Sequence, residues 1–194
     1  EWEKARTELA QVRGYKNAEE LVKESYYRAG LAYLEAGEWE KARAELEQVA
    51  GYKDAEDLVK ESYYRPGLAY FEAGEWEKAR AELEQVAGYK DAEDLVKESY
   101  YRPGLAYFEA GEWEKAKMKL QQVAGYKDAE DLVKKCYYQL GLACLEVANM
   151  EQAEEALRQV LKLERGYKDA GLKLLEALGH EMVYVPAGEF IMGS

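Results

Sequence analysis

Two consecutive segments of this chain, 38–74 and 75–111, are identical over their whole length. A near copy precedes them at 1–37, a looser copy follows at 112–148, and a weaker fifth unit occupies 149–179. Self-similarity at a fixed period of this size is the signature of a solenoid or a related repeat array. A stack of one unit presents a repeated surface, so the pattern favours a binding protein over a fold built round one catalytic centre.

The first part of each unit predicts a short amphipathic helix. In the second copy this helix spans 38–49, and its apolar residues recur at steps of three, four and three along one stripe. The stripe consists of Trp39, Ala42, Leu46 and Val49. Gly51 then favours a left-handed cap. Asp54, with Asp57 three residues later, predicts a capping-box-like start for the next helix.

A second, longer helix is predicted over 55–73. Its buried face is expected to be broad and to contain Leu58, Val59, Ser62, Tyr63, Pro66, Ala69, Tyr70 and Ala73. Two pairs four residues apart, Glu56 with Lys60 and Glu61 with Arg65, stand in the order that stabilises a helix. One antiparallel helix pair in each period, joined by short turns, predicts an all-α solenoid.

Pro66 and Pro103 stand inside this longer helix in the two identical copies. Proline removes one helical hydrogen bond and disfavours α geometry at the preceding residue. We expect a kinked but continuous helix, with a break and restart at the proline as the alternative. Cys136 and Cys144 lie about 12 Å apart along one predicted helix. This is too far for a disulfide, so we expect two small buried thiols.

The residues at the junction of the two helices resemble a tetratricopeptide repeat. Segment 63–86 reads Y-x-x-x-G-L-A-Y-x-E-A-G-E-W-E-K-A-x-x-x-L-x-x-V, with related segments at 26–49, 100–123 and 137–160. The family's motif positions are Gly67, Tyr70, Gly74, Ala79 and Leu83. The resemblance implies a right-handed solenoid of antiparallel helix pairs. The period of 37 residues is longer than usual for the family, and a Gly-Tyr-Lys-Asp link replaces its helix-ending proline.

In that family the first helix of each pair lines a concave groove that holds a partner segment. Carried over residue by residue, the resemblance gives as partner-binding candidates Tyr27, Leu31, Tyr64, Leu68, Phe71, Tyr101, Leu105, Phe108, Tyr138 and Leu142. Tyrosine-rich surfaces of this kind are common at protein interfaces. The alternative is that these tyrosines pack between adjacent repeats, since a stacked unit must bury a continuous core.

The pattern changes after the fourth copy. The link at 166–169 arrives four residues late, which predicts a preceding helix one turn longer, followed by a short helix over 170–178. Apolar runs at 182–192 predict a β-hairpin. The segment MVYVPAGEFIMGS at 182–194 resembles the opening of the formylglycine-generating-enzyme and sulfatase-modifying family. We therefore expect a solenoid over 1–179 and the start of a C-type-lectin-like domain over 180–194.

Charge and motif content limit the chemistry. The formal net charge of −12 argues against nucleic acid and anionic membranes as partners, because both reward an excess of Lys and Arg. His180 is the only histidine and has no second ligand nearby, so no metal or other cofactor is expected. The sequence has no phosphate-binding loop or nucleophile motif. Because the chain starts at Glu1 inside a repeat, we expect a truncated N terminus, and without a signal peptide a cytoplasmic location.

The sequence therefore predicts a non-catalytic scaffold that binds a protein or peptide segment in its groove and tethers a C-terminal domain. One alternative is that the repeats recruit a substrate for a metal-dependent oxidative enzyme whose catalytic part follows Ser194. Another is architectural, because identical units expose identical faces and permit head-to-tail stacking into a homo-oligomer.

Overall fold

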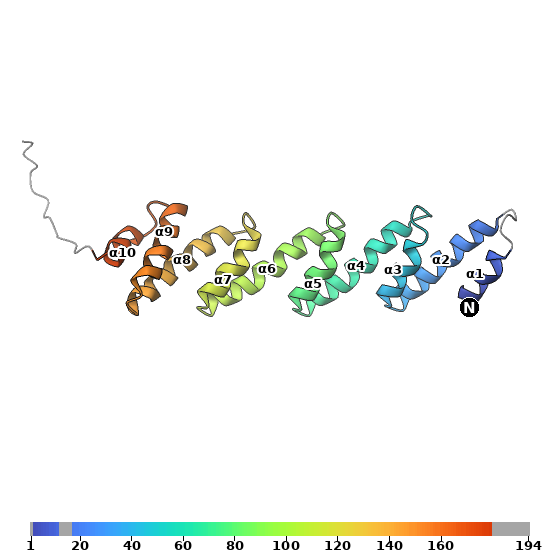
Figure 1. Cartoon of the computed structure of the whole chain (residues 1–194), viewed down its shortest axis with the longest axis horizontal. Coiled ribbons are helices and arrows are strands. Elements are labelled where there is room, and N and C mark those ends of the chain that lie inside the picture. The colour runs from blue at the N-terminus through green and yellow to red at the C-terminus, as the bar shows by residue number, and fades with distance from the viewer. Residues whose placement is uncertain (1, 12–16, 180–194) are drawn as a thin grey trace, which may run out of the picture. The chain divides into compact units, whose positions relative to one another are not determined.

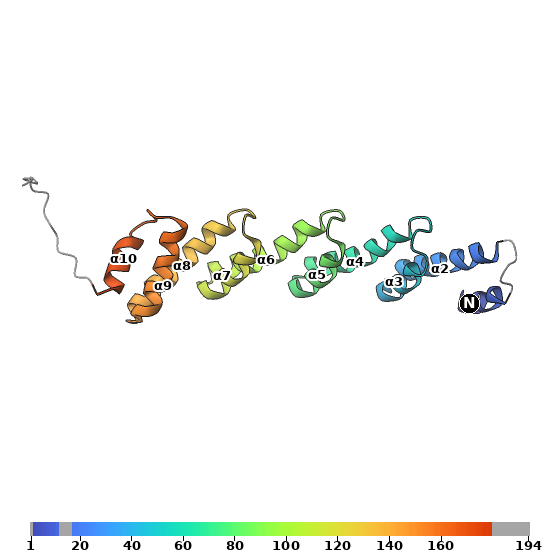
Figure 2. The same cartoon turned by 45° about the horizontal axis from the view of Figure 1, so that its top comes forward.

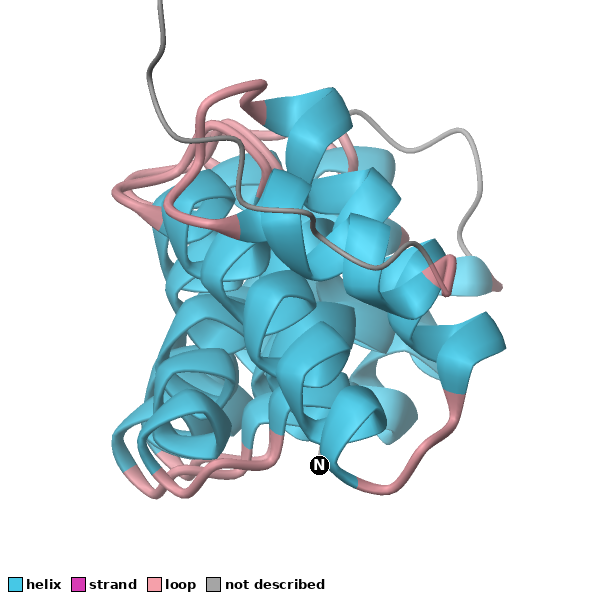
Figure 3. Cartoon of the chain, turned by 90° about the vertical axis from the view of Figure 1, so that its left-hand side faces the viewer, coloured by secondary structure: helices cyan, strands magenta, loops and turns pink. Residues whose placement is uncertain are grey.

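The computed structural model describes residues 2–11 and 17–179. The β-hairpin predicted at 182–192 and the lone histidine, His180, lie outside these residues. Every regular element within the described ranges is a helix, as Figure 3 shows. The chain divides into two compact units, 1–99 and 100–194, and their boundary falls within helix α6 (Ala92–Glu109).

Consecutive helices lie side by side and antiparallel within each unit (Figures 1 and 2). Before α6, the first unit contains α1 (Trp2–Ala10), α2 (Ala18–Glu35), α3 (Trp39–Glu47), α4 (Ala55–Glu72), α5 (Trp76–Leu83) and the 3-10 helix η1 (Glu84–Val86). After α6, the second contains α7 (Trp113–Leu120), the 3-10 helix η2 (Gln121–Val123), α8 (Ala129–Glu146), α9 (Met150–Leu163) and α10 (Ala170–Ala177). These helix pairs confirm the predicted all-α solenoid.

The short helices bury the stripe that the sequence predicts. Ala42 and Leu46 of α3 are fully buried, and Val49 is only 3% exposed. The helix itself ends at Glu47 rather than at Val49. The chain tightens into a turn there, and in the next repeat the corresponding residues form η1. The last apolar residue of the stripe thus packs from the turn and not from the α-helix.

The two helices of a repeat approach most closely at a glycine of the longer helix. A β-carbon built on Gly67 of α4 would lie 2.7 Å from Cγ of Leu83 in α5, closer than real Cβ atoms come. The same contact recurs between Gly30 and Leu46, Gly104 and Leu120, and Gly141 and Leu157. All four leucines are fully buried. Glycine is needed at this position because no side chain fits between the helices.

The buried face of α4 is narrower than the sequence predicts. Ala69 and Ala73 were expected on it, but both are exposed. At the helical rotation of about 100° per residue, they lie roughly 200° and 240° around the helix from Gly67. They therefore sit on the side of α4 that faces away from its closest neighbour.

Helix α4 begins without the predicted capping box. Asp54 precedes the helix, but its side chain makes no cap hydrogen bond. Its Oδ1 instead accepts a hydrogen bond of 2.5 Å from the hydroxyl of Tyr27 in α2. The backbone of Asp54, with φ −104° and ψ 23°, also lies outside the extended region typical of N-cap residues. A tertiary contact has displaced the local one.

One of the two predicted ion pairs of α4 forms. Glu61 Oε1 lies 2.8 Å from Arg65 Nε. Lys60 pairs with Asp57 rather than Glu56, and the Asp57 Oδ1 lies 2.8 Å from the Lys60 Nζ.

Helices α4 and α6 continue through Pro66 and Pro103. This confirms the continuous helix and makes the break-and-restart alternative wrong. Each proline lacks the N–H that would bind the carbonyl four residues earlier, so that carbonyl needs another donor.

An arginine from the preceding short helix supplies the missing donor. Nη2 of Arg43 in α3 donates to the carbonyl oxygen of Ser62, the acceptor that Pro66 leaves unserved, at 3.2 Å. Arg80 in α5 donates in the same way to the carbonyl oxygen of Ser99 at 3.0 Å. The proline is tolerated because a neighbouring helix completes the hydrogen bonding of the backbone.

The last described helices follow the sequence closely. Helix α9 has 14 residues, whereas α7 and η2 together have 11, so the helical segment is longer by about the one turn that the sequence predicts. Helix α10 is short, and Gly179 follows it with φ 73°. Cys136 and Cys144 are both free thiols, as the spacing predicts, but only Cys136 is buried and Cys144 is half-buried.

Replacing Gly67 with alanine should lower the free energy of unfolding by roughly 1–3 kcal/mol, because the added methyl overpacks the contact with Leu83. The urea midpoint, followed by circular dichroism, measures the change. Gly171→Ala in α10 is the matched control. No atom lies within 4 Å of its β-carbon position, so the midpoint should stay or rise. An unchanged midpoint for Gly67→Ala would contradict the close-approach argument.

The arginine–carbonyl contact should be coupled in energy to the proline. In a double-mutant cycle of Arg43→Met and Pro66→Ala we expect a coupling free energy of about 1 kcal/mol, because alanine restores the helical donor. Urea denaturation of the four proteins measures it. A parallel cycle of Arg43→Met with Ala69→Ser, at an exposed position, should give additive effects. Additivity in the proline cycle would rule out the compensation.

Candidate functional site

Each Gly-Tyr-Lys-Asp link packs its tyrosine against a tyrosine of the preceding long helix. The rings of Tyr64 in α4 and Tyr89 in the link meet edge to face, with centroids 5.8 Å apart. The Tyr64 hydroxyl donates to Oδ1 of Asp91 at 2.6 Å, and this hydrogen bond is the main reason that the pKa of Tyr64 rises to about 12. The corresponding ring pairs are Tyr27 with Tyr52, Tyr101 with Tyr126, and Tyr138 with Tyr167.

The lysine of the link lies across both rings. Lys90 has φ 50°, in the left-handed region, which costs an L-residue roughly 1–2 kcal/mol. Its Nζ lies 4.5 Å from the ring centroid of Tyr64 and 5.1 Å from that of Tyr89, within cation–π range. The left-handed backbone recurs at the link residues Lys53, Lys127 and Lys168, with φ values of 50°, 49° and 44°. The strained turn is therefore a constant part of the repeat.

A carboxylate from the long helix completes the arrangement. Glu61 Oε2 accepts hydrogen bonds from Lys90 Nζ at 2.6 Å and from the Tyr89 hydroxyl at 2.9 Å. Its Oε1 accepts from Arg65 Nε at 2.8 Å. Burial alone would raise the pKa of Glu61, but these three hydrogen bonds outweigh burial and lower the pKa to about 2. We call the following side chains, and their equivalents in other repeats, the link cluster: Glu61, Tyr64, Tyr89, Lys90 and Asp91.

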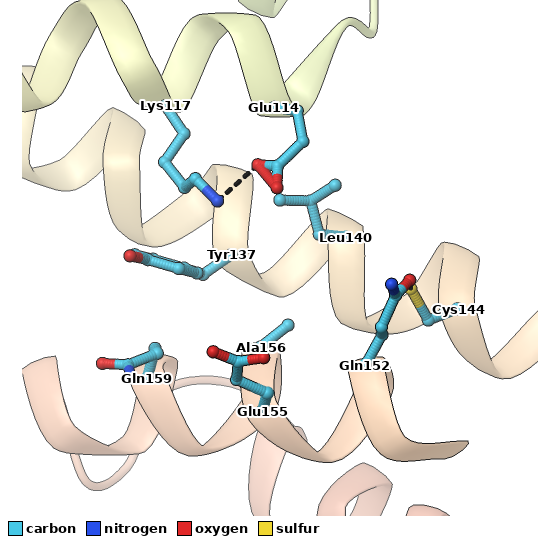
Figure 4. A pocket seen from close by; sticks show the side chains of 9 residues that line it. All are labelled: Glu114, Lys117, Tyr137, Leu140, Cys144, Gln152, Glu155, Ala156 and Gln159. Atoms are coloured by element: carbon cyan, nitrogen blue, oxygen red, sulfur yellow. Dashed lines mark hydrogen bonds and ion pairs between the residues drawn. The ribbon is translucent and has the colours of Figure 1, made fainter. Parts of the chain in front are cut away.

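A shallow pocket opens between successive repeats, beside the short helices. In the second unit it has a volume of about 370 Å³ and is lined by side chains of α7, α8 and α9 (Figure 4). Lys117 and Glu114 form an ion pair on its α7 side, opposite Glu155 and Gln159 of α9. Cys144 and Gln152 lie together at one end.

The same pocket recurs in the first unit, with a volume of about 320 Å³. Arg43 takes the place of Lys117 there, and its Nη2 lies 2.7 Å from Glu82 Oε2. Lys41 also lines the pocket of the first unit and pairs with Glu38, so the basic residues of this pocket are each paired with a carboxylate in both units.

The described residues bring together few groups of the kinds that perform chemistry. Burial raises the pKa of the Cys136 thiol to about 11, which keeps it protonated at neutral pH. Across residues 2–11 and 17–179, no three His, Cys, Asp or Glu side chains are grouped so that they could hold a metal ion.

The ten predicted partner-binding residues fall into two classes of exposure. Tyr64, Phe71, Tyr101 and Tyr138 are buried, and Phe71 packs edge to face on Trp76 with centroids 5.4 Å apart. Half-buried are Tyr27, Leu31, Leu68, Leu105, Phe108 and Leu142. The four tyrosines belong to link clusters, and their hydroxyls bind link aspartates. The four leucines pack against the core and keep part of their surface exposed, and a role for any of the ten in binding stays a prediction.

Sequence reasoning missed the link cluster as a unit. Its signal is a fixed spacing: the segments Glu-Ser-Tyr-Tyr-Arg at 24–28 and 61–65 each precede a Gly-Tyr-Lys-Asp link at 51–54 and 88–91 by the same distance. The local interpretation of the link aspartate as a helix cap concealed this connection.

Family comparisons agree with this architecture. A tetratricopeptide repeat model matches residues 24–52, 61–89 and 98–126, and a second tetratricopeptide repeat model matches 134–167. Together the matches cover more than half of the chain. The chain belongs to the tetratricopeptide repeat family. As an array of such repeats, its described part is a protein–protein interaction scaffold, and repeats of this family are typically non-catalytic.

Two similar solved structures are of MamA. The structure of MamA AMB-1 is 20% identical, covers 83% of this chain and 85% of that chain, and has a TM-score of 0.28. A MamA mutant is 22% identical, covers 84% and 91%, and has a TM-score of 0.27. A search of curated proteins found no match. The repeat models end at residue 167, and the resemblance of 182–194 to the sulfatase-modifying family stays a prediction.

No helix within the described ranges combines the length and the apolar character needed to cross a membrane.

The array should lose stability in acid. In the folded protein the pKa values of Glu24 and Glu61 are about 2, against an ordinary value of 4.5. For Glu24 the main cause is its hydrogen bond with Lys53. A depressed pKa stabilises the fold above the unfolded value, and this contribution is lost as the pH falls toward the folded value. We expect a melting temperature that is level between about pH 7 and 5 and falls between about pH 4.5 and 2.

The double variant Glu24→Gln/Glu61→Gln removes these two titrations. Its melting temperature should be lower than that of the parent at pH 7, and its decrease between about pH 4.5 and 2 should be shallower. Glu56→Gln, exposed and outside the link cluster, serves as the control and should leave the profile unchanged. Thermal melts by circular dichroism give the profiles, and a parent-like slope in the double variant would show that other carboxylates control acid stability.

Proposed function

We propose that this tetratricopeptide array binds an apolar segment of a partner protein along its long helices. One observation supports the proposal. With the tyrosines held in link clusters, one leucine in each long helix stays half-buried at the same register, namely Leu31, Leu68, Leu105 and Leu142. Equivalent leucines in successive repeats offer a partner a row of anchor positions.

The surroundings of these leucines suit an interface. On α4, Arg65, Leu68, Ala69 and Glu72 follow the pattern i, i+3, i+4, i+7 and therefore share one side of the helix. Ala69 and Glu72 are exposed, and the side chain of Arg65 is 54% exposed. A small apolar centre with a charged rim is the composition of interfaces between proteins that also exist apart.

The buried members of the predicted set support this surface from beneath. Tyr64 fixes α4 to the link through Asp91, and Phe71 fixes it to α5 through Trp76. Side chains locked by such contacts keep the neighbouring accessible residues in a defined geometry, which lowers the entropy lost on binding.

We also propose that the array tethers the domain whose start is suggested by the segment from Met182 onward. The support is the sequence resemblance. The continuation of the sequence tests it, since a continuation without the remaining motifs of that family would remove the proposal.

The leucine row is tested with peptides selected from a random display library against the 194-residue chain. For a selected peptide, Leu31→Gln/Leu68→Gln should weaken binding at least about tenfold, a loss of roughly 1.4 kcal/mol, measured by fluorescence anisotropy. The control is Ala44→Gln/Ala81→Gln, at exposed positions of α3 and α5, which should leave the affinity unchanged.

Circular dichroism melts of both double variants establish that they fold. Peptides that bind the leucine variant as tightly as the parent would show that the partner surface lies elsewhere. A greater loss of peptide affinity in the control variant of α3 and α5 would indicate that the partner surface lies on the short helices.

A further inference from the structure

The fourth copy of the link cluster differs from the others at its carboxylate. Lys135 stands where Glu24 and Glu61 stand in the first two copies, and Gln139 takes the place of the arginine that follows. The rest of the cluster is retained, with Tyr138 on α8 and Tyr167, Lys168 and Asp169 in the link. One acidic group has thus been replaced by a basic one within an otherwise unchanged arrangement.

The donors of the fourth cluster keep their geometry. The rings of Tyr138 and Tyr167 meet edge to face with centroids 5.5 Å apart, and the Tyr138 hydroxyl donates to Asp169. Lys168 Nζ lies 4.6 Å and 5.3 Å from the two ring centroids, against 4.5 Å and 5.1 Å for Lys90. Lys168 Nζ therefore lies over its two rings in the same position that Lys90 Nζ has over Tyr64 and Tyr89, where Lys90 binds Glu61.

These retained donors have lost their acceptor. Within residues 2–11 and 17–179, Lys168 and Lys135 form no ion pair, and the hydroxyl of Tyr167 forms no hydrogen bond. The equivalent groups in the preceding unit, Lys90 and Tyr89, both bind one carboxylate oxygen of Glu61. The fourth cluster thus has two lysine ammonium groups and a phenol without the anion that the repeat otherwise supplies.

The acidic side chains nearest this cluster are engaged elsewhere. Asp131 and Glu164 lie 2.9 Å and 2.6 Å from Lys134 Nζ. Asp169 accepts from Tyr138, which lowers the pKa of its carboxyl. Lys168 and Lys135 interact with Asp169 and Asp131 only through space, and neither is held by a carboxylate oxygen as Lys90 is held by Glu61.

We propose that the fourth link cluster binds a carboxylate side chain of an acidic segment in the partner protein, in the position that Glu61 occupies in its own cluster. The inference rests on the proposed function and adds the chemistry of the partner. In the other copies the bound carboxylate is carried by a polypeptide side chain, and Lys168 and Tyr167 offer the same two donors. Lys135 adds a second cation, which favours a segment with more than one acidic residue.

The probe is an acetylated, fluorescein-labelled hexaglutamate peptide, with hexaglutamine as its matched neutral peptide. Binding to the whole chain is measured by fluorescence anisotropy at low and moderate salt. Hexaglutamate should bind and hexaglutamine should not, and added salt should weaken binding. Lys135→Glu, which supplies the internal carboxylate of the other copies, should weaken binding at least about tenfold. Lys168→Gln should weaken it as well.

Two variants separate this site from general charge effects. Lys90→Gln removes the same charge from a cluster already occupied by Glu61, so hexaglutamate affinity should stay within about twofold of the parent. Glu61→Lys/Arg65→Gln converts the second cluster into the fourth and should add a second site for hexaglutamate. Circular dichroism establishes that each variant folds.

Several results would overturn the proposal. The first is that Lys135→Glu binds hexaglutamate as tightly as the parent. The second is that Lys90→Gln and Lys168→Gln lose hexaglutamate affinity equally. The third is that millimolar inorganic phosphate competes fully with hexaglutamate, which would indicate a site for free anions. Failure of hexaglutamate to bind while library peptides still depend on Leu31 and Leu68 would remove this inference and leave the proposed function. Lys135-dependent hexaglutamate binding with leucine variants that bind their peptides normally would instead remove the leucine row.

Discussion

The contact between Gly67 and Leu83 is the constraint on which the rest of the repeat depends. With a glycine opposite a fully buried leucine, the two backbones approach more closely than any side chain would allow. The short helix α5 can then bury Ala79 and Leu83 fully and turn at once into the link. The position of that turn brings Tyr89 back onto Tyr64 of the same helix pair. The link cluster is therefore a consequence of helix proximity as much as of its own side chains.

The prolines show that neighbouring repeats are coupled through the backbone as well as through packing. Pro66 breaks a local rule of helix formation, and its cost is offset by Arg43 of the preceding short helix, α3. The first copy has Ala29 at the equivalent position, and there Arg6 stacks on Tyr26 and pairs with Glu45, just as Arg43 stacks on Tyr63 and pairs with Glu82. A nearest-neighbour description of stability thus includes an interface contribution from this arginine, which stacks on a tyrosine and pairs with a glutamate in both copies.

Much of the fold follows from the sequence because its determinants are local or periodic. The stripe through Ala42 and Leu46 fixes the short helix, and the four-residue delay of the last link fixes the extra turn of α9. The failures have a common cause. Asp54 satisfies the rule for a helix cap, but a tyrosine 27 residues earlier competes for its carboxylate, and a local rule contains no information about that competitor. The same limit applies to the predicted site. Leu68 and Tyr64 share a helical face, and only their tertiary contacts decide that Tyr64 is buried while Leu68 stays half-buried.

Repetition also makes departures from the pattern informative. In a protein with one copy of each element, a lysine such as Lys135 on a helix surface has many equivalent explanations. Here the other copies display the same surroundings with a glutamate in place, and Glu61 shows which donors converge on it and at what distances. The copies therefore differ in one charged group, while the backbone, the two rings and the link lysine are the same. The comparison has the same form as a designed single substitution. Identical repeats can only present one surface several times, so selectivity for a partner must arise where a copy keeps the scaffold and changes the group that the scaffold holds.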